Sequence, residues 1–227
     1  MTPVLTCVRG DNSDLIAEVA KLHLRKGAEV ADVTFGRGVF WKKVDLKKAG
    51  VARFWMSDIN PKYGATVTFN GKKEIALINK ADFRDFGGIL SRYDVVVLDP
   101  PYMHGGATVK KSIKKCYGNG GKSTKYASHE AILGLYQDGI VAAWHALKPG
   151  GTLWVKCQDE IESGKQKWSH IEILDIATSR YPQTGGKPLF KAVDLFVLMQ
   201  ATTPARRLPY QLHARKNHSY LWIFKKL

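Results

Sequence analysis

The chain has 227 residues and a hydrophobic share of 44%, which suits one large α/β domain with a sizeable core. No apolar run is long enough to span a bilayer and no signal peptide opens the chain, so the cytoplasm is the expected compartment. Subtracting 20 Asp and Glu from 35 Lys and Arg leaves a net charge of +15, which indicates a polyanionic partner, usually nucleic acid. The 3 cysteines are scattered without a CxxC pair, so we expect neither a disulfide framework nor a metal site.

Apolar spacing and turn residues predict an alternation of helices and strands along most of the chain. In chain order, we expect a helix from the capping residues 11–13 to Gly27, a strand at 29–34, a helix at 39–50, strands at 53–58, 74–82 and 93–99, a helix at 130–147, a strand at 152–159, a helix at 165–180, and final strands at 191–200 and 219–226. This alternation is typical of a mostly parallel sheet with helices on both faces. Because no helix separates the last two strands, we expect them to pair antiparallel at one edge.

Positive charge is concentrated in two connecting segments. The segment at 103–129 exceeds the usual loop length in a compact domain, and loops of that size are usually functional or disordered. The connection at 181–218 carries a second basic group. We expect the following residues to contact nucleic acid: Lys110, Lys111, Lys114, Lys115, Lys122, Lys125, Arg206, Arg207, Arg215 and Lys216.

The ends of three predicted strands carry residues suited to an adenosine group, since ligands of open α/β sheets bind at the carboxyl ends of the strands. Gly36 and Gly38 allow a ligand to approach the backbone closely, although their turn is not GxGxxG and a dinucleotide is less favoured. Asp58, 22 residues after Gly36, is placed to accept both hydroxyls of a ribose. Asp82 suits an exocyclic amine and Phe83 suits a purine face. NAD and S-adenosylmethionine both carry adenosine, so these residues alone leave the two open.

The fourth predicted strand ends in Asp-Pro-Pro-Tyr, residues 99–102. Prolines cannot donate to a sheet ladder, so they end the strand and fix the backbone. The Asp99 carboxylate and the Pro100 carbonyl then form two adjacent acceptors, which suit a planar NH2 group with two N–H donors. Tyr102 is placed to stack on the ring that carries this amine. The motif therefore predicts a site for an aromatic amine.

The sequence resembles the S-adenosylmethionine-dependent DNA amino-methyltransferases of the adenine-N6/cytosine-N4 class. The resemblance rests on DVTFGRG, MSDINP, KADF, LDPPY, LKPGGTLWVKCQD and HARKNHSYLWIFKK, which cover nearly the whole chain in the expected order. It implies a Rossmann-like class I methyltransferase fold: a seven-stranded, mostly parallel sheet with an antiparallel edge strand and helices on both faces. Members with Asp at the first position of the motif usually act on adenine.

The resemblance also implies residue roles. Asp99, Pro100, Pro101 and Tyr102 would be catalytic. S-adenosylmethionine would bind to Asp32, Thr34, Phe35, Gly36, Gly38, Asp58, Ile59, Asp82, Phe83 and Asp99. The glycine turn departs from the family pattern, because Thr34 holds the usual Phe position and Arg37 replaces a small residue.

DNA methyltransferases of this class usually carry a separate target-recognition region. This chain has room only for the 103–129 loop and the 181–218 connections, so we expect a single domain over residues 1–227. The preferred hypothesis is methylation of adenine N6 in DNA by a monomer or homodimer without a membrane partner. Amine methylation in RNA and cytosine-N4 methylation in DNA are the alternatives. A catalytically silent nucleic-acid-binding subunit and a protein-glutamine methyltransferase are less favoured.

Overall fold

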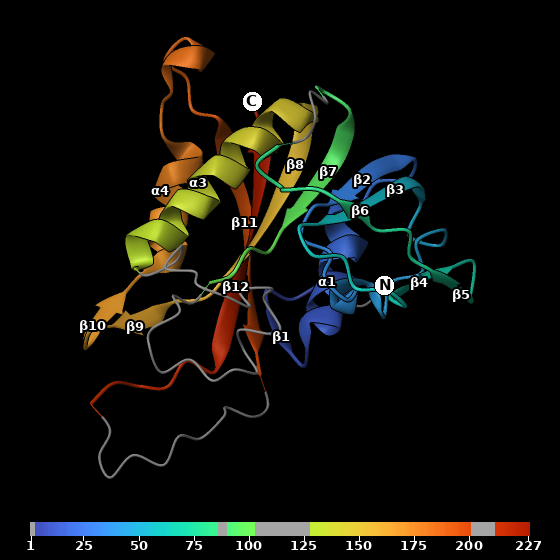
Figure 1. Cartoon of the computed structure of the whole chain (residues 1–227), viewed down its shortest axis with the longest axis horizontal. Coiled ribbons are helices and arrows are strands. Elements are labelled where there is room, and N and C mark those ends of the chain that lie inside the picture. Colours follow the sequence, from blue (N-terminus) through green and yellow to red (C-terminus); the bar gives the residue numbers. More distant parts are fainter. Residues whose placement is uncertain (1–2, 86–89, 103–127, 201–211) are drawn as a thin grey trace.

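The computed structural model describes residues 3–85, 90–102, 128–200 and 212–227, and an eight-stranded sheet forms its centre (Figure 1). Its strands are β1 (Cys7–Arg9), β2 (Ala28–Asp32), β3 (Val51–Asp58), β6 (Asn79–Lys80), β7 (Tyr93–Leu98), β8 (Leu147–Cys157), β11 (Phe190–Met199) and β12 (His218–Lys226). They lie in the order β1-β11-β12-β8-β7-β2-β3-β6. All neighbours pair parallel except β12, which is antiparallel to both β8 and β11.

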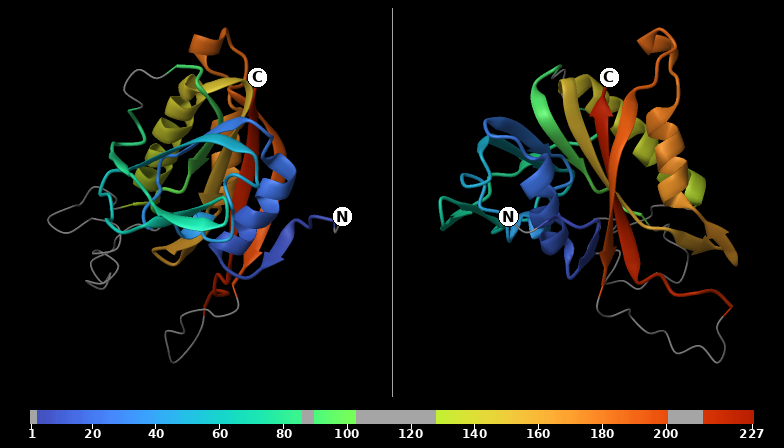
Figure 2. Two further views of the ribbon diagram at one scale, coloured as in Figure 1. Left: turned by 90° about the vertical axis from the view of Figure 1, so that its right-hand side faces the viewer. Right: turned by 180° about the vertical axis from the view of Figure 1, so that it is seen from behind.

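Helices cover both faces of this sheet (Figure 2). On one face, α1 (Asn12–His23) packs in a core with Val95, Val97 and Trp154. On the other face, α3 (His129–Ala146) and α4 (Ser169–Thr178) pack in a second core with Val96 and Leu98. The alternation of Val95 to Leu98 between the two cores follows from the two-residue period of a strand. None of the helices in the described part of the chain combines the length and apolar character needed to span a membrane.

The predicted start of the first helix is confirmed. The Asp11 carboxylate accepts hydrogen bonds from the backbone N–H of Ser13 at 2.8 Å and of Asp14 at 3.1 Å. The Asp14 carboxylate in turn accepts from the Asp11 N–H at 3.0 Å, which completes a capping box. The first residue of α1, Asn12, lies at the cavity described below.

The helix predicted at 39–50 is wrong. Only η1 (Val39–Trp41) forms a 3-10 turn there, and turns follow. Trp41 is fully buried and its indole N–H donates to the Asp32 carboxylate at 2.6 Å, while the Leu46 N–H donates to the Thr68 carbonyl at 2.9 Å. The Leu46 N–H is therefore unavailable to the i to i−4 ladder of a helix, and the backbone N–H groups of Trp41 and Val44 bond to carbonyls only three residues back.

Two hairpins were missed at places where the sequence carries a turn signal. Residues 74–82 do not form one strand: β5 (Lys72–Ile75) pairs with β4 (Thr66–Phe69), and the two-residue β6 follows separately. A second hairpin joins β9 (Glu160–Glu162) to β10 (Lys165–Lys167), so α4 begins later than predicted. Their turns, Asn70–Gly71 and Ser163–Gly164, have positive φ at both residues, as two-residue hairpin turns require.

The fold class is confirmed, and two details of the predicted sheet are corrected. The sheet has eight strands, because β1 pairs with β11 at the edge. The antiparallel strand β12 lies inside the sheet, between β8 and β11. Its side chains explain this position, since Leu221 and Ile223 enter one core while Phe224 enters the other. A strand buried on both faces gains more from an interior position than from an edge. A short turn, η2 (Pro182–Thr184), precedes β11.

Candidate active site

A cavity of about 350 Å³ lies at the carboxyl ends of β2, β3 and β7. Most of the predicted site residues line it: Asp32, Thr34, Phe35, Gly36, Asp58, Ile59, Phe83, Asp99, Pro100 and Pro101. Gly38, Asp82 and Tyr102 are not among the lining residues. The topology explains this gathering, because β2 is flanked by β3 on one side and β7 on the other, so three successive parallel strand ends meet.

The glycine turn after β2 is tied directly to the end of β3. The Gly36 N–H donates to Asp58 Oδ2 at 2.9 Å, and the Asn60 N–H donates to Asp58 Oδ1 at 2.7 Å. Gly36 and Gly38 have φ of 55° and 67°, a region that favours glycine. A Cβ at Gly38 would also lie 2.8 Å from Cζ of Phe35. The turn therefore presents backbone beside a carboxylate that keeps further lone pairs for a ligand.

Asp32 anchors this turn from inside the sheet. Its carboxylate accepts from the Trp41 indole N–H at 2.6 Å and from the Thr34 N–H at 3.1 Å. Burial raises the pKa of Asp32 to about 7, against the lowering effect of those two hydrogen bonds, and the nearby charges of Asp99 and Asp58 raise it further. Burial, with a smaller contribution from the two neighbouring carboxylates, therefore favours the protonated form of Asp32.

Asp99 follows β7, and its backbone N–H donates to Thr34 Oγ1 at 2.7 Å, which joins the β7 end to the glycine turn. Its Oδ1 is buried and has no hydrogen-bond partner among the described residues. Burial raises the pKa of Asp99 to about 6, partly offset by the positive charge of Lys156. An acceptor that is buried without a partner is costly, and such atoms in native sites commonly await a ligand.

Tyr102 lies beyond the two prolines, with Lys156 Nζ 5.9 Å from the centre of its ring. Phe83 reaches the cavity from the segment after β6 and packs against α3. A Cβ at Gly139 of α3 would come within 3.0 Å of the Phe83 ring, so the missing side chain of that glycine makes room for the ring. Phe83 thus forms an apolar wall of the cavity, which is the position that the sequence predicted.

Asp82 has a different neighbour from the one expected. Its carboxylate accepts from Arg84 Nε at 2.9 Å and from Arg84 Nη2 at 2.5 Å. The predicted bond to an exocyclic amine stays a prediction, since Asp82 lies beside the cavity without lining it.

Asn12 was missed by the sequence analysis. It is the first residue of α1, lines the cavity, and has a buried Oδ1 without a hydrogen-bond partner among the described residues. The sequence shows a polar residue after an N-cap, which is common at helix starts and carries no sign of a ligand. Only the packing of α1 against the sheet brings it to the strand ends.

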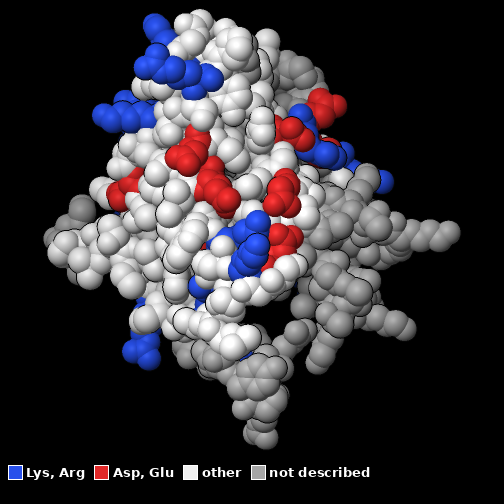
Figure 3. Space-filling model, turned by 90° about the vertical axis from the view of Figure 1, so that its left-hand side faces the viewer, with Lys and Arg blue, Asp and Glu red and all other residues white. Residues whose placement is uncertain are grey.

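Most of the predicted nucleic-acid contacts lie outside the described residues. These are the six lysines between 110 and 125 together with Arg206 and Arg207, so the described part keeps a net charge of +7, the total of +15 less those eight. Arg215 and Lys216 are described, and Lys216 Nζ lies 5.8 Å from the centre of the Trp168 ring. On the face in Figure 3, basic side chains gather at the upper end and acidic side chains lie across the middle.

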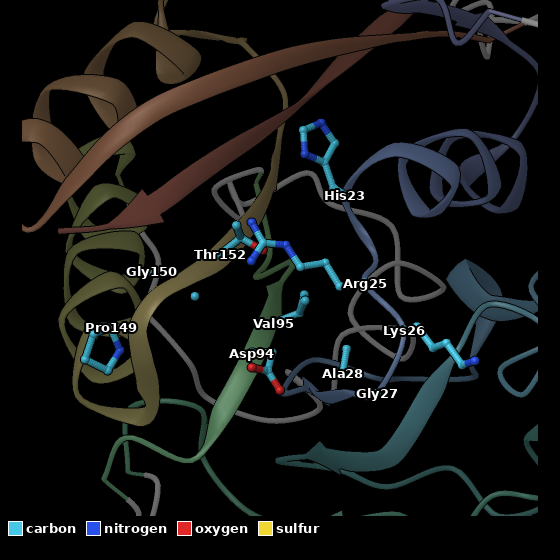
Figure 4. Close-up of a pocket in the computed structure, with 11 residues that line it drawn as sticks. His23, Arg25, Lys26, Gly27, Ala28, Asp94, Val95, Pro149, Gly150 and Thr152 are labelled. Carbon is cyan, nitrogen blue, oxygen red and sulfur yellow. The ribbon is translucent and has the colours of Figure 1, made fainter.

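A second cavity, of about 180 Å³, lies at the opposite end of the central strands from the Asp99 site (Figure 4). It is lined by the segment after α1, by the start of β7 and by the turn within β8, with Arg25 extending into it. The amino ends of the parallel strands β2 and β7 lie here, so this cavity is separate from the Asp99 site at their carboxyl ends. Among the described residues, no group of three or more His, Cys, Asp or Glu is placed to hold a metal ion.

No protein-family model and no curated protein matches this sequence. The structure is similar to that of TrmN from Thermus thermophilus, with a TM-score of 0.52 and 14% identity over 95% of this chain and 48% of the TrmN chain. It is also similar to 1,6-didemethyltoxoflavin-N1-methyltransferase from Burkholderia thailandensis, solved with 1,6-didemethyltoxoflavin and S-adenosylhomocysteine. That likeness has a TM-score of 0.50 and 13% identity over 95% of this chain and 78% of the other.

These likenesses show the fold. The chain has the Rossmann-like class I methyltransferase fold, and it spans about half the length of TrmN.

Proposed function

We propose that this chain is an S-adenosylmethionine-dependent methyltransferase that acts on the exocyclic amine of a base in nucleic acid, and we favour adenine N6 in DNA. One observation carries the proposal. Asp99, the first residue of Asp-Pro-Pro-Tyr, lies in the same cavity as the Gly36–Asp58 turn and holds a buried acceptor atom without a partner among the described residues.

The cavity offers polar residues suited to the ribose and methionine parts of the proposed cofactor, and apolar residues suited to its adenine ring. Asp58 offers carboxylate oxygens to the ribose, and the Gly36 turn lets the ligand approach the backbone. Phe83 and Ile59 supply apolar walls suited to the adenine ring. Asn12 Oδ1 and Asp32 are acceptors suited to the amino group of the methionine part. When bound, S-adenosylmethionine supplies an electrophilic methyl group on a positively charged sulfur.

The residues of Asp-Pro-Pro-Tyr would prepare the amine. The lone pair of an adenine amine is delocalised into the ring, which makes the nitrogen a poor nucleophile. Hydrogen bonds from its two N–H groups to Asp99 and to the Pro100 carbonyl would favour a pyramidal nitrogen with a directed lone pair, and Tyr102 would stack on the ring. The nitrogen gains positive charge as its bond to carbon forms. Asp99 stabilises that charge and can accept the proton that the nitrogen then loses.

Adenine is favoured as the base because the motif begins with Asp, and a net charge of +15 suits a polyanion. DNA is favoured because the motifs resemble those of the DNA amino-methyltransferases. A base inside a duplex would have to be flipped out to reach this site. Amine methylation in RNA is the second candidate. It is favoured because the described residues gather around one eight-stranded sheet and two two-stranded hairpins, with no separate recognition region among them.

The test is a methylation assay with tritiated S-adenosylmethionine on duplex DNA, structured RNA and single strands, followed by mass spectrometry of the nucleosides. We expect N6-methyladenine in DNA and a loss of at least about 10²-fold in turnover for Asp99→Ala, as for removal of one preorganised electrostatic group. Asp175→Ala on the exposed side of α4 is the matched control. N4-methylcytosine would overturn the base assignment, and activity on RNA alone would favour the second candidate. Cofactor turnover unaffected by Asp99→Ala would refute the catalytic site.

A further inference from the structure

Lys156, on β8, is 2% exposed, although its side chain ends in an ammonium group. Removing an ammonium group from water is expensive unless other groups compensate for the lost hydration. The neighbouring positions on the strand, Val155 and Cys157, enter the core beneath α3, whereas Lys156 points to the opposite face together with Trp154. That face is the one that carries Asp32 and Asp99 at the strand ends, so the lysine is buried toward the cavity side of the sheet.

The sheet register places Lys156 beside Asp99. Leu98 of β7 pairs in parallel with Val155 of β8, so the next residues along the two strands, Asp99 and Lys156, are neighbours on one face. On the other side, Leu221 of β12 pairs with Lys156, and Lys156 Nζ donates to Ser219 Oγ at 2.7 Å. The same Nζ lies 5.9 Å from the centre of the Tyr102 ring. β7, β8 and β12 thus place one buried ammonium near both Asp99 and Tyr102 of Asp-Pro-Pro-Tyr.

Titratable groups of both charges surround this pair, and Arg37 and Lys62 line the same cavity as Asp99. Asp32 and Asp58 face Asp99 from the ends of β2 and β3. Cys157 and Asp159 follow Lys156 on its own strand and beyond. Tyr136 of α3 donates to the Lys156 carbonyl at 2.9 Å. Among the described residues, Lys156 is the cation whose charge acts on Asp99.

Each member of the pair favours the charged form of the other. Burial raises the pKa of Asp99, and the charge of Lys156 lowers it. Burial lowers the pKa of Lys156, and the charge of Asp99 raises it. A protonated Asp99 keeps one acceptor oxygen but loses the negative charge that strengthens its hydrogen bond to the amine and stabilises the developing positive charge. The ionisation of Asp99 therefore affects how well the site activates the amine.

We propose that Lys156 is a positioning residue for amine methylation: its buried ammonium keeps Asp99 as a carboxylate and fixes the Tyr102 ring beside it. This inference rests on the function proposed above. Lys156 would act through Asp99 and Tyr102 without touching the reacting atoms.

The first test needs no substrate. Protein labelled with carboxyl-13C aspartate is titrated by NMR, and Asp99→Asn assigns the Asp99 signal. We expect Lys156→Met to raise the titration midpoint of Asp99 by about one pH unit or more, as loss of a neighbouring opposite charge does. Lys156→Arg keeps the charge and should keep the midpoint near wild type. If Lys156→Met does not fold, Lys156→Gln carries the same test, since its amide can still contact Ser219.

Two controls separate charge from packing. Ser219→Ala removes the hydrogen bond to Lys156 and leaves the charge, so the Asp99 midpoint should move little. Lys148→Met makes the same substitution on the same strand. Lys148 Nζ lies 2.9 Å from Asp94 Oδ2, and this pair does not line the cavity that holds Asp99. An Asp99 midpoint that is equal in wild type and Lys156→Met would overturn the proposal.

The second test is the pH profile of kcat. In Lys156→Met the acidic limb should move upward with the NMR midpoint. A rise of one pH unit from about 6 lowers turnover about 10-fold at pH 5 and about 2-fold at pH 7, with recovery near pH 9. A purely structural lysine would lower kcat by the same factor at every pH, and that result would overturn the proposal. If no substrate is methylated by the wild type, the proposed function fails, whereas the NMR titration still decides whether Lys156 controls Asp99.

Discussion

Replacing Asp99 by Asn should stabilise the protein at alkaline pH, because the Asp99 carboxylate is buried in an environment that disfavours its charge. The substitution nearly preserves the shape of the side chain. It also breaks no hydrogen bond of Oδ1 among the described residues, since that atom has none. What changes is the charge, and the pKa of about 6 against an ordinary value of 3.8 measures how strongly the fold disfavours that charge.

The magnitude follows from linkage. A carboxyl group whose pKa is raised on folding contributes stability that is complete below its unfolded pKa and is lost as the pH rises through its folded pKa. The rise from 3.8 to about 6 corresponds to roughly 3 kcal/mol at pH 8 and to about 0.5 kcal/mol at pH 4. The neutral Asn side chain of Asp99→Asn does not ionise, so the variant does not lose this stability as the pH rises. Lys156 loses its partner in the variant, so we expect a net gain of about 1–3 kcal/mol at pH 8.

The assay is urea unfolding followed by circular dichroism at several pH values between 4 and 8. The free energy of unfolding of Asp99→Asn should exceed that of wild type by an amount that grows with pH up to about pH 7. Asp175→Asn removes a charge from an exposed position of α4 and should change stability by less than about 0.5 kcal/mol throughout. Equal stability of wild type and Asp99→Asn at pH 8, or a gain independent of pH, would refute the reasoning.

Three further predictions follow from single contacts. Asp58→Ala should weaken S-adenosylmethionine binding by about 1–3 kcal/mol in calorimetric titration, because it removes the charged acceptor, and equal affinity would remove Asp58 from the site. Gly38→Ala should lower the free energy of unfolding by about 1–3 kcal/mol or more, since its φ is 67° and a Cβ would meet Phe35. Gly64→Ala is the control, because Gly64 also has a positive φ, 79°, but a Cβ there meets no atom. Equal losses in the two variants would argue against a contribution from the Phe35 contact. For His129, burial lowers the pKa but hydrogen bonds to two glutamates raise it above the ordinary 6.5. The protonated His129 therefore stabilises the folded protein fully below pH 6.5, and this contribution is lost as the pH rises through the raised pKa. His129→Gln should destabilise the protein more at pH 6 than at pH 9, which thermal unfolding at the two pH values measures.

Local patterns in the sequence were enough to predict the fold class and the main cavity residues. The buried strand that ends in Asp-Pro-Pro-Tyr, the glycine turn at 36–38 and the cap at Asp11 are each encoded within a few neighbouring residues. A parallel sheet then brings the ends of such strands to one edge, so the meeting of Asp58 and Asp99 followed from topology alone. The lysine-rich segment at 103–127 lies outside the described residues, and its contact with nucleic acid stays a prediction.

Tertiary packing decided the features that join distant parts of the chain. Trp41 is buried and bonds to Asp32, and Leu46 bonds to Thr68, so the helix predicted at 39–50 stops after one 3-10 turn. No local pattern at 39–50 reveals these distant partners. The interior place of β12 depends on apolar side chains that enter two cores at once.

Asn12 and Lys156 carry no functional signal in the sequence. Asn12 lines the cavity, and Lys156 lies near Tyr102, only because α1 and β8 pack beside the strand ends. Sequence periodicity records which faces of an element are buried. The free energy that selects their partners comes from contacts between residues far apart in the chain, and only the folded structure contains those contacts.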